Sequence, residues 1–122
     1  MITIYFDGNK NPSGAGCSYR LETDNGNLLE EESIAANISH TIPQLEYLSL
    51  IAGLVAAAKH CVPAETHINV FGDSMLVVHQ ISGEWETKVI ELRKLRGKAR
   101  TLLAKFKSYK ITWVPRKSNK VG

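Results

Sequence analysis

Apolar and polar positions form three short strand-like runs at the start of the chain. Residues 2–6 (ITIYF) are mostly β-branched or aromatic and stop abruptly at Asp7, which indicates a strand that ends there. Residues 16–23 (GCSYRLET) alternate like a strand, and a DNGN turn separates them from residues 28–38 (LLEEESIAANI), which are predicted to be the partner strand. Three antiparallel strands are therefore predicted to open the chain.

The pattern then changes to helical spacing. Thr41 supplies a hydroxyl suited to capping a helix and Pro43 falls in the first turn, so a helix is predicted to begin here and to end near Cys61. We expect this helix to pack across the strands. Its apolar positions recur at helical spacing: Leu45, Leu48, Ala52, Val55 and Ala58.

The second half of the chain predicts a strand, two helices and a last strand. HINVFGDS (67–74) is a short apolar run, and SMLVVHQISG (74–83) fits a short helix, so the junction falls at Asp73. The longest helix is predicted over 87–107, and SYKITWVP (108–115) is a fifth strand. The apolar stripe of the longest helix is expected to be core: Leu92, Leu95, Ala99, Leu102, Leu103 and Phe106.

This order of elements predicts an α/β fold with a five-stranded mixed sheet flanked by helices. A length of 122 residues with 43% hydrophobic content fits one domain over residues 1–122. Cys17 and Cys61 lie in apolar contexts, which favours buried free thiols and a reducing compartment over a disulfide or a metal site. No apolar run approaches the roughly 18 residues of a membrane span, so we expect a cytoplasmic monomer that does not enter membranes.

Charged residues are distributed unevenly along the chain. Residues 1–87 hold 3 basic and 11 acidic side chains, whereas residues 88–122 hold 12 basic and 1 acidic side chain. A basic C-terminal third attracts a polyanion such as a nucleic acid, and the acidic remainder can place carboxylates where cations bind. The alternative is a solvated, lysine-rich helix face.

Three acids stand out because of where they fall. Asp7 and Asp73 end predicted strands, and Glu46 lies one turn into the first long helix. Singly, each has an ordinary explanation, because the aspartates can cap turns and the glutamate can complement the helix dipole. Together they favour a site, since strands one and four are expected to be neighbours and a helix across them would bring all three acids to one edge.

A cluster of carboxylates without matching bases predicts a divalent cation. Oxygen ligands alone suit Mg²⁺ or Mn²⁺, and no set of His or Cys residues suits zinc. Two such ions about 3.5 to 4 Å apart are the arrangement with which nucleases and polymerases act on phosphodiesters. This prediction agrees with the basic C-terminal third, which would bind the rest of a nucleic-acid backbone.

Four segments together resemble the type 1 ribonuclease H family: YFDGN with NPSGAG, QLEYLSLIAGLVAA, INVFGDSMLVVHQISGEW, and ITWVPRKSNK. The similarity runs in order over nearly the whole chain, with the spacing of compact bacterial, archaeal and retroelement members, and FGDS followed by LVVHQ and GEW is its most specific part. The resemblance implies a five-stranded mixed sheet flanked by helices, and endonucleolytic cutting of the RNA strand of RNA/DNA hybrids. Other nucleases of the same fold, such as exonuclease or integrase cores, share the carboxylates without that motif.

The resemblance also implies roles for single residues. Asp7, Glu46 and Asp73 match three of the four family carboxylates that bind two Mg²⁺ or Mn²⁺ ions. The other matching positions are expected to contact the hybrid, with Asn11 in its minor groove, Thr41 at a DNA-strand phosphate, Ser74 beside the third acid, and Trp85 against the DNA strand. Asn11 can instead form a turn with Pro12, and Trp85 can instead pack against the longest helix.

Two departures from the family pattern affect the predicted site. Ile42 and Pro43 stand where relatives carry two asparagines, so Gln44 is expected to reach the hybrid in their place, or Ile42 to make only an apolar contact. Arg116 and Asn119 match the R-x-x-N stretch after strand five, which in the family leads to the fourth aspartate and a final helix.

That aspartate would directly follow Gly122, so the resemblance predicts a truncated or curtailed relative that lacks this ligand and the last helix. Loss of the ligand would weaken the second ion site and slow hydrolysis. The alternative function is therefore a noncatalytic module that binds the hybrid through the same fold.

Overall fold

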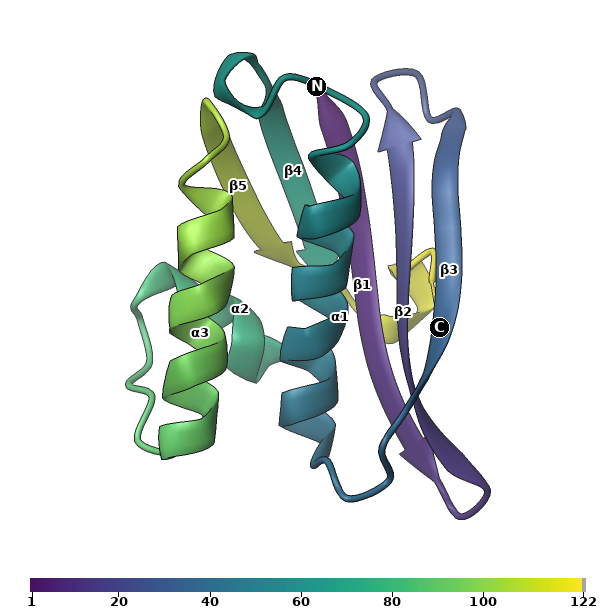
Figure 1. Cartoon of the computed structure of the whole chain (residues 1–122), viewed down its shortest axis with the longest axis vertical. Coiled ribbons are helices and arrows are strands. Elements are labelled where there is room, and N and C mark those ends of the chain that lie inside the picture. Colours follow the sequence, from purple (N-terminus) through teal and green to yellow (C-terminus); the bar gives the residue numbers. More distant parts are fainter. Residues whose placement is uncertain (122) are drawn as a thin grey trace.

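The five strands form one mixed sheet in the order β3-β2-β1-β4-β5 (Figure 1). A computed structural model describes residues 1–121. The pairs β1–β2 and β2–β3 are antiparallel, whereas β1–β4 and β4–β5 are parallel, as predicted for a mixed sheet. The strand bounds are β1 (Ile2–Asn11), β2 (Gly14–Thr23), β3 (Leu28–Ala36), β4 (His67–Gly72) and β5 (Ser108–Trp113).

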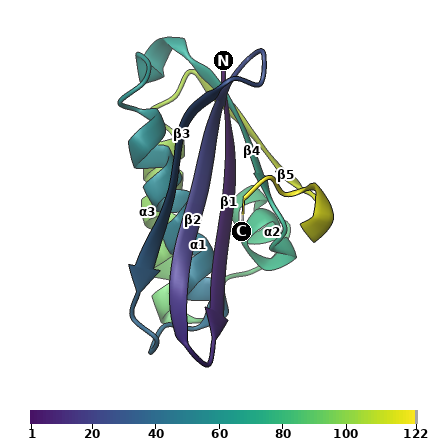
Figure 2. The same ribbon diagram turned by 90° about the vertical axis from the view of Figure 1, so that its right-hand side faces the viewer.

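Two long helices pack side by side on one face of this sheet (Figures 1 and 2). They are α1 (Ile42–Ala57) and α3 (Ile90–Leu103), and α2 (Met75–Ser82) contacts both. Two short 3₁₀ turns, η1 (Pro63–Glu65) and η2 (Arg116–Ser118), complete the elements. Within residues 1–121 no helix has the length and apolar character needed to cross a membrane.

The core lies between the sheet and these helices. Alternate residues of β1 point into it because successive side chains of a strand face opposite sides. The predicted stripe of α3 is buried at Leu92, Ala99, Leu103 and at Phe106 beyond the helix end, and Leu95 and Leu102 pack against it. The side chains with almost no exposed surface include Ile4, Phe6, Leu21, Tyr47, Leu50, Leu54, Ile68 and Val70.

The observed ends of several elements differ from the predicted ones. Asp7 does not end the first strand, because β1 continues to Asn11 by pairing with β2 alone, whereas its parallel pairing with β4 stops at Phe6. Helix α1 ends at Ala57 rather than near Cys61, since the following residues form tighter turns. Helix α3 occupies residues 90–103 rather than 87–107.

Strand β3 is an edge of the sheet and carries three consecutive glutamates, Glu30, Glu31 and Glu32. Charged side chains are a common device on edge strands, which otherwise offer unpaired backbone groups to other chains. Both cysteines are free thiols, as predicted, with Cys17 buried and Cys61 half-buried.

Strand β1 and helix α1 approach each other closely at Gly8. A Cβ atom built on this glycine would lie 2.3 Å from the carbonyl carbon of Leu45 and 2.5 Å from the backbone nitrogen of Glu46. Backbone atoms cannot move aside as a flexible side chain can, so only glycine fits here. The contact therefore sets how near the helix lies to the strand.

We expect Gly8→Ala to lower the free energy of unfolding by about 3 kcal/mol or more, because the added methyl group overpacks against backbone atoms. Gly14→Ala is the matched control, since no atom lies within 4 Å of a Cβ at that strand position. Urea unfolding of both variants is the measurement. Equal stability of the two variants would contradict the close packing at Gly8.

Candidate functional site

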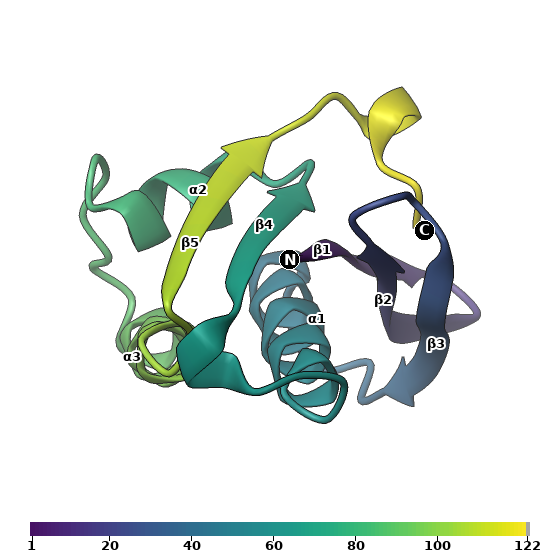
Figure 3. The ribbon, with the colours of Figure 1, turned by 90° about the horizontal axis from the view of Figure 1, so that it is seen from above.

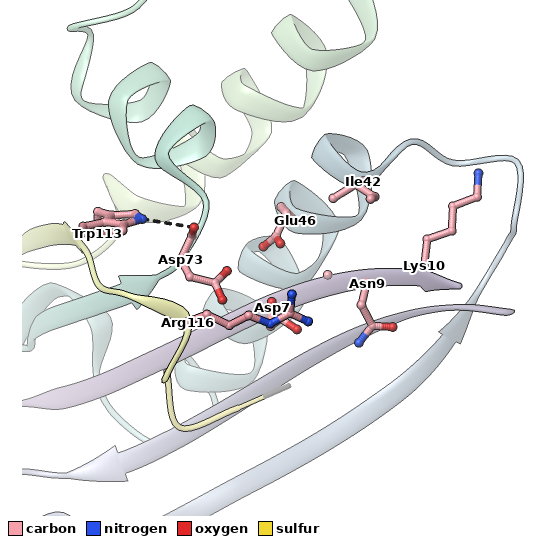
Figure 4. A pocket seen from close by; sticks show the side chains of 9 residues that line it. Asp7, Asn9, Lys10, Ile42, Glu46, Asp73, Trp113 and Arg116 are labelled. Atoms are coloured by element: carbon pink, nitrogen blue, oxygen red, sulfur yellow. Dashed lines mark hydrogen bonds between the residues drawn. The ribbon is translucent and has the colours of Figure 1, made fainter. Parts of the chain in front are cut away.

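Three carboxylates from distant parts of the chain meet where the pairing of β1 with β4 ends (Figure 4). Asp7 belongs to β1, Glu46 to α1, and Asp73 directly follows β4. A ligand oxygen of each lies within 4.8 Å of those of the other two. Asp7 and Glu46 are each only 5% exposed, and Asp73 is half-buried. The structure therefore brings the three predicted acids together.

Contacts between β1 and α1 hold two of these acids in place. The Ser49 hydroxyl donates to backbone carbonyl oxygens and lies 2.7 Å from that of Asp7 and 2.8 Å from that of Leu45. The backbone N–H of Gly8 lies close enough to the Glu46 carboxylate to lower its pKa. These contacts are possible because the glycine lets the strand approach the helix backbone.

Burial and mutual repulsion raise the pKa of two of the carboxyl groups. Desolvation and the charge of Asp7 are the main causes that raise the pKa of Glu46 from 4.5 to about 8. Desolvation and the charge of Asp73 raise the pKa of Asp7 from 3.8 to about 6. The positive charge of Arg116 lowers both pKa values without cancelling the rise.

The donor atoms fit a divalent cation. Oε2 of Glu46 is buried and has no hydrogen-bond partner among residues 1–121, which is costly unless a cation or ligand completes it. All three ligands are carboxylates, the donors that Mg²⁺ and Mn²⁺ prefer, and no described His or Cys belongs to the cluster. The site is therefore suited to a hard metal ion.

The carboxylates line a pocket of about 390 Å³, called here the carboxylate pocket. Its remaining walls come from Gly8, Asn9, Lys10, Ile42, Trp113 and Arg116. The indole Nε1 of Trp113 donates to the carbonyl oxygen of Asp73 at 3.1 Å, and Nζ of Lys10 donates to the carbonyl oxygen of His40 at 3.1 Å.

Sequence reasoning missed four residues of this pocket: Gly8, Asn9, Lys10 and Trp113. A signal was available for Trp113, because it ends a strand parallel to β4 and its register partner is Gly72, next to Asp73. Carboxyl ends of neighbouring parallel strands lie at the same edge of a sheet. No comparable signal marked Lys10, whose place depends on the extension of β1 beyond Asp7.

Arg116 and Asn119 follow β5 and lie in different surroundings. The Arg116 side chain lies beside that of Asp7 in the carboxylate pocket (Figure 4). The Asn119 side chain is partly buried, and its Nδ2 donates to the carbonyl oxygen of Phe6 at 3.0 Å. Arg116 is thus available to a ligand in the pocket, whereas Asn119 fastens the chain to β1.

Thr41 and Gln44 form a reciprocal cap at the start of α1. The backbone N–H of Gln44 donates to the Thr41 hydroxyl at 3.3 Å, and the Gln44 side-chain oxygen accepts from the Thr41 backbone N–H at 2.7 Å. The predicted capping role of Thr41 is confirmed. Both residues also line a second pocket of about 540 Å³, together with Ser39, Pro43, Val89, Glu91 and Leu92.

Asn11 and Ser74 have local structural roles. The side-chain oxygen of Asn11 accepts from the backbone N–H of Ser13 at 2.9 Å, which is the turn predicted as the alternative. Ser74 is the N-cap of α2 and accepts from the backbone N–H of Val77 at 3.2 Å. Contacts of either residue with a hybrid stay predictions.

Trp85 follows α2 and packs against His79 of that helix. Its ring lies 4.7 Å from the ring of His79, centroid to centroid, and its backbone N–H donates to the His79 carbonyl oxygen at 3.1 Å. The indole is 44% exposed. The indole is therefore packed against α2 on one side, and its exposed part is available for an aromatic contact with a ligand.

The basic character of α3 divides into two groups of residues. Three arginines donate to backbone carbonyl oxygens of the preceding segment: Arg93 to Thr87 at 2.6 Å, Arg96 to Gln80 at 2.8 Å, and Arg100 to Ile81 at 2.8 Å. They hold α2 and the following loop against α3. Lys94 and Lys98 are exposed and make no ion pair among residues 1–121, so these two lysines of α3 are free to meet a polyanion.

We expect the metal-free protein to lose stability as the pH rises from about 5 to 8. The folded state keeps the Glu46 proton up to a pKa of about 8, whereas the unfolded chain releases it near 4.5, so stability is fully present below the unfolded value and is lost above it. The loss is on the order of 1.4 kcal/mol per pH unit between the two values.

Urea unfolding in EDTA at several pH values measures this loss. Glu46→Gln should flatten the profile, and Glu86→Gln, which changes an exposed carboxylate, should not. A Glu46→Gln profile as steep as that of the unaltered protein would show that another group is responsible.

Known proteins of one family resemble this chain in sequence. The family described as reverse transcriptase-like matches residues 5–122. Ribonuclease HI of Halobacterium salinarum is 38% identical over 120 residues, which are 97% of this chain and 58% of that protein. The bifunctional protein Rv2228c of Mycobacterium tuberculosis is 35% identical over 112 residues, which are 92% of this chain and 29% of that protein. The chain thus spans only part of these relatives.

Solved structures agree with this sequence relationship. The crystal structure of RNase H1 from Halobacterium salinarum NRC-1 has a TM-score of 0.89 at 36% identity and covers 98% of this chain and 89% of that one. The N-terminal RNase H domain of Rv2228c has a TM-score of 0.87 at 34% identity, covering 97% and 84%. LC11-RNase H1, solved in complex with an RNA/DNA hybrid, shares the fold with a TM-score of 0.89 at 24% identity, covering 98% and 89%. The chain belongs to the reverse transcriptase-like family and, within it, to the type 1 ribonuclease H proteins.

Proposed function

We propose that this chain is a metal-dependent endonuclease that hydrolyses the RNA strand of RNA/DNA hybrids. The observation that carries the proposal is the cluster of Asp7, Glu46 and Asp73, whose ligand oxygens lie within 4.8 Å of one another around a buried, unpartnered oxygen. Membership of the ribonuclease H family supports the choice of substrate. A related structure of the same fold contains an RNA/DNA hybrid.

The three carboxylates are proposed to hold two Mg²⁺ or Mn²⁺ ions. Ions bound by these three carboxylates would supply activation of the attacking water and stabilisation of the leaving oxygen of a phosphodiester. The chain itself contributes fixed ligands, because Ser49 and Gly8 hold β1 and α1 together behind Asp7 and Glu46. Since Glu46 keeps its proton up to a pKa of about 8, a cation must displace that proton, and cation binding therefore strengthens with pH.

Arg116 is proposed to contact the phosphate that is cut. It lies in the carboxylate pocket on the side of Asp7, and a guanidinium there can donate to phosphate oxygens that gain charge during hydrolysis. Trp113 forms a further wall of the pocket and fixes the backbone at Asp73 through its indole N–H. Together these groups orient the phosphate against the carboxylates.

The rest of the hybrid is proposed to lie over residues at the start of α1 and after α2. Thr41 and Gln44 line the second pocket, where a DNA-strand phosphate can be held, and Trp85 offers an exposed aromatic face. Asn11 and Ser74 are proposed as additional contacts, and Asn119 acts through its bond to β1. The exposed lysines of α3 add charge attraction that weakens with salt.

We expect the protein to cut only the RNA strand of a labelled hybrid in Mg²⁺ or Mn²⁺. Asp73→Asn should slow cutting by at least about a hundredfold, the scale of losing one electrostatic group from a preorganised site. Asp24→Asn is the control, because that exposed aspartate pairs with the N-terminus away from the pocket. Duplex DNA and single-stranded RNA should stay intact. Salt-sensitive binding of the hybrid without any cutting would support the noncatalytic alternative.

We expect Mn²⁺ to raise the melting temperature more at pH 8 than at pH 5.5, because protons compete with the cation for the buried carboxylates. Differential scanning fluorimetry with and without EDTA measures the shift. Glu46→Gln should remove most of it, and Glu86→Gln should leave it unchanged. A shift of the same size in Glu46→Gln would place the cation elsewhere.

A further inference from the structure

The residues after β5, called here the C-terminal segment (114–121), cross the sheet from one edge strand toward the other side. The backbone N–H of Val114 donates to the carbonyl oxygen of Gly72 at the end of β4 at 2.9 Å. Asn119 then bonds β1 at Phe6. Figures 2 and 3 show the segment on the face of the sheet opposite α1 and α3, running from β5 toward β2.

Lys120 is held at the far end of this crossing by β2. Its Nζ lies 3.2 Å from each carboxylate oxygen of Glu22 and 5.5 Å above the centroid of the Tyr5 ring. The Glu22 side chain is only 3% exposed and also accepts from Nε of Arg20 at 2.7 Å. The Lys120 side chain is itself 52% exposed, but because its partner carboxylate is buried the pair is screened less by solvent than a pair of two exposed groups.

The same segment carries Arg116 into the carboxylate pocket. Among residues 1–121 the Arg116 guanidinium makes no hydrogen bond or ion pair, so its position depends on the backbone that bears it. That backbone is fixed on the C-terminal side, because the Arg116 carbonyl oxygen accepts from the Asn119 N–H at 3.1 Å. Asn119 in turn is bonded to Phe6, directly before Asp7.

We propose that Lys120 is a positioning residue, which holds the C-terminal segment on the outer face of the sheet so that Arg116 stays in the carboxylate pocket. The proposal rests on the proposed function, in which Arg116 contacts the phosphate that is cut. Through Lys120 the C-terminal segment is joined to Glu22 and Tyr5, which lie on the outer face of the sheet, outside the carboxylate pocket.

The chain offers substitutions that separate positioning from folding. Lys120→Met removes the charge but keeps an unbranched side chain, and Glu22 retains Arg20 as its partner, so the fold is expected to persist. Lys120→Arg keeps the charge and should restore the unaltered behaviour. Lys117→Met is the matched control, because Lys117 is an exposed lysine of η2 that bonds no described residue.

The first readout is the order of the Arg116 side chain, which needs no cleavage. The heteronuclear NOE of its Nε–Hε group, measured by ¹⁵N NMR on the 122-residue chain, should fall in Lys120→Met and be unchanged in Lys120→Arg and Lys117→Met. An Arg116 signal that is unaffected by Lys120→Met would overturn the proposal.

The second readout is cleavage of an RNA/DNA hybrid. Lys120→Met should lower kcat about tenfold, the scale of a small misplacement at the reacting centre, with KM changed less than about twofold. In an Arg116→Ala background the same change should cost nothing more. An equal loss in both backgrounds would show that Lys120 does not act through Arg116.

If the unaltered chain cuts no hybrid, the proposed function fails, and the NMR comparison still decides whether Lys120 holds Arg116.

Discussion

The site depends on a mismatch in length between two neighbouring strands. Strand β1 pairs with β4 only as far as Phe6 but continues along β2 to Asn11. Beyond that point its backbone groups have no strand partner on the side of β4, and site residues take their place. The Phe6 carbonyl accepts from Asn119, and Gly8 packs directly against the backbone of α1 at Leu45 and Glu46. The C-terminal segment and α1, which both bear functional side chains, are thus fixed where the pairing of β1 with β4 ends.

This arrangement buries acidic groups next to one another, which opposes folding unless protons or cations compensate the charge. The raised pKa values of Asp7 and Glu46 express that cost. The fold tolerates it because the surrounding contacts are backbone contacts. Gly8 touches the backbone of α1 directly, so this contact cannot relax by a change of side-chain rotamer, and the buried Ser49 hydroxyl adds a hydrogen bond from α1 to the backbone of β1.

Most of the fold could be predicted from the sequence, because its strands and helices have clear periodicity. The three acids could be predicted as a group from their positions at or near the ends of elements. The extension of β1 could not, since residues 8–11 have the composition of a turn and are held in a strand only by pairing with β2. Because β1 extends in this way, Lys10 lies at the carboxylate pocket.

The distribution of charge along the sequence does not show which basic side chains are available to a ligand. The basic C-terminal third, residues 88–122, was expected to attract a polyanion, yet three arginines of α3 bond carbonyl oxygens at and beyond the end of α2. Hydrogen bonds of this kind depend on which loop packs beside the helix, and nothing in the local sequence of α3 distinguishes these arginines from its lysines. Composition therefore overestimates the surface available for nucleic acid.

The acidic edge of the sheet has a consequence for contacts between molecules. Glu30, Glu31 and Glu32 occupy consecutive positions of the outermost strand, so any chain that extended the sheet at β3 would lie along several carboxylates. Such pairing is unfavourable for a neutral or acidic segment and for a second β3. The charge of the outermost strand therefore disfavours edge-to-edge association of two molecules along β3.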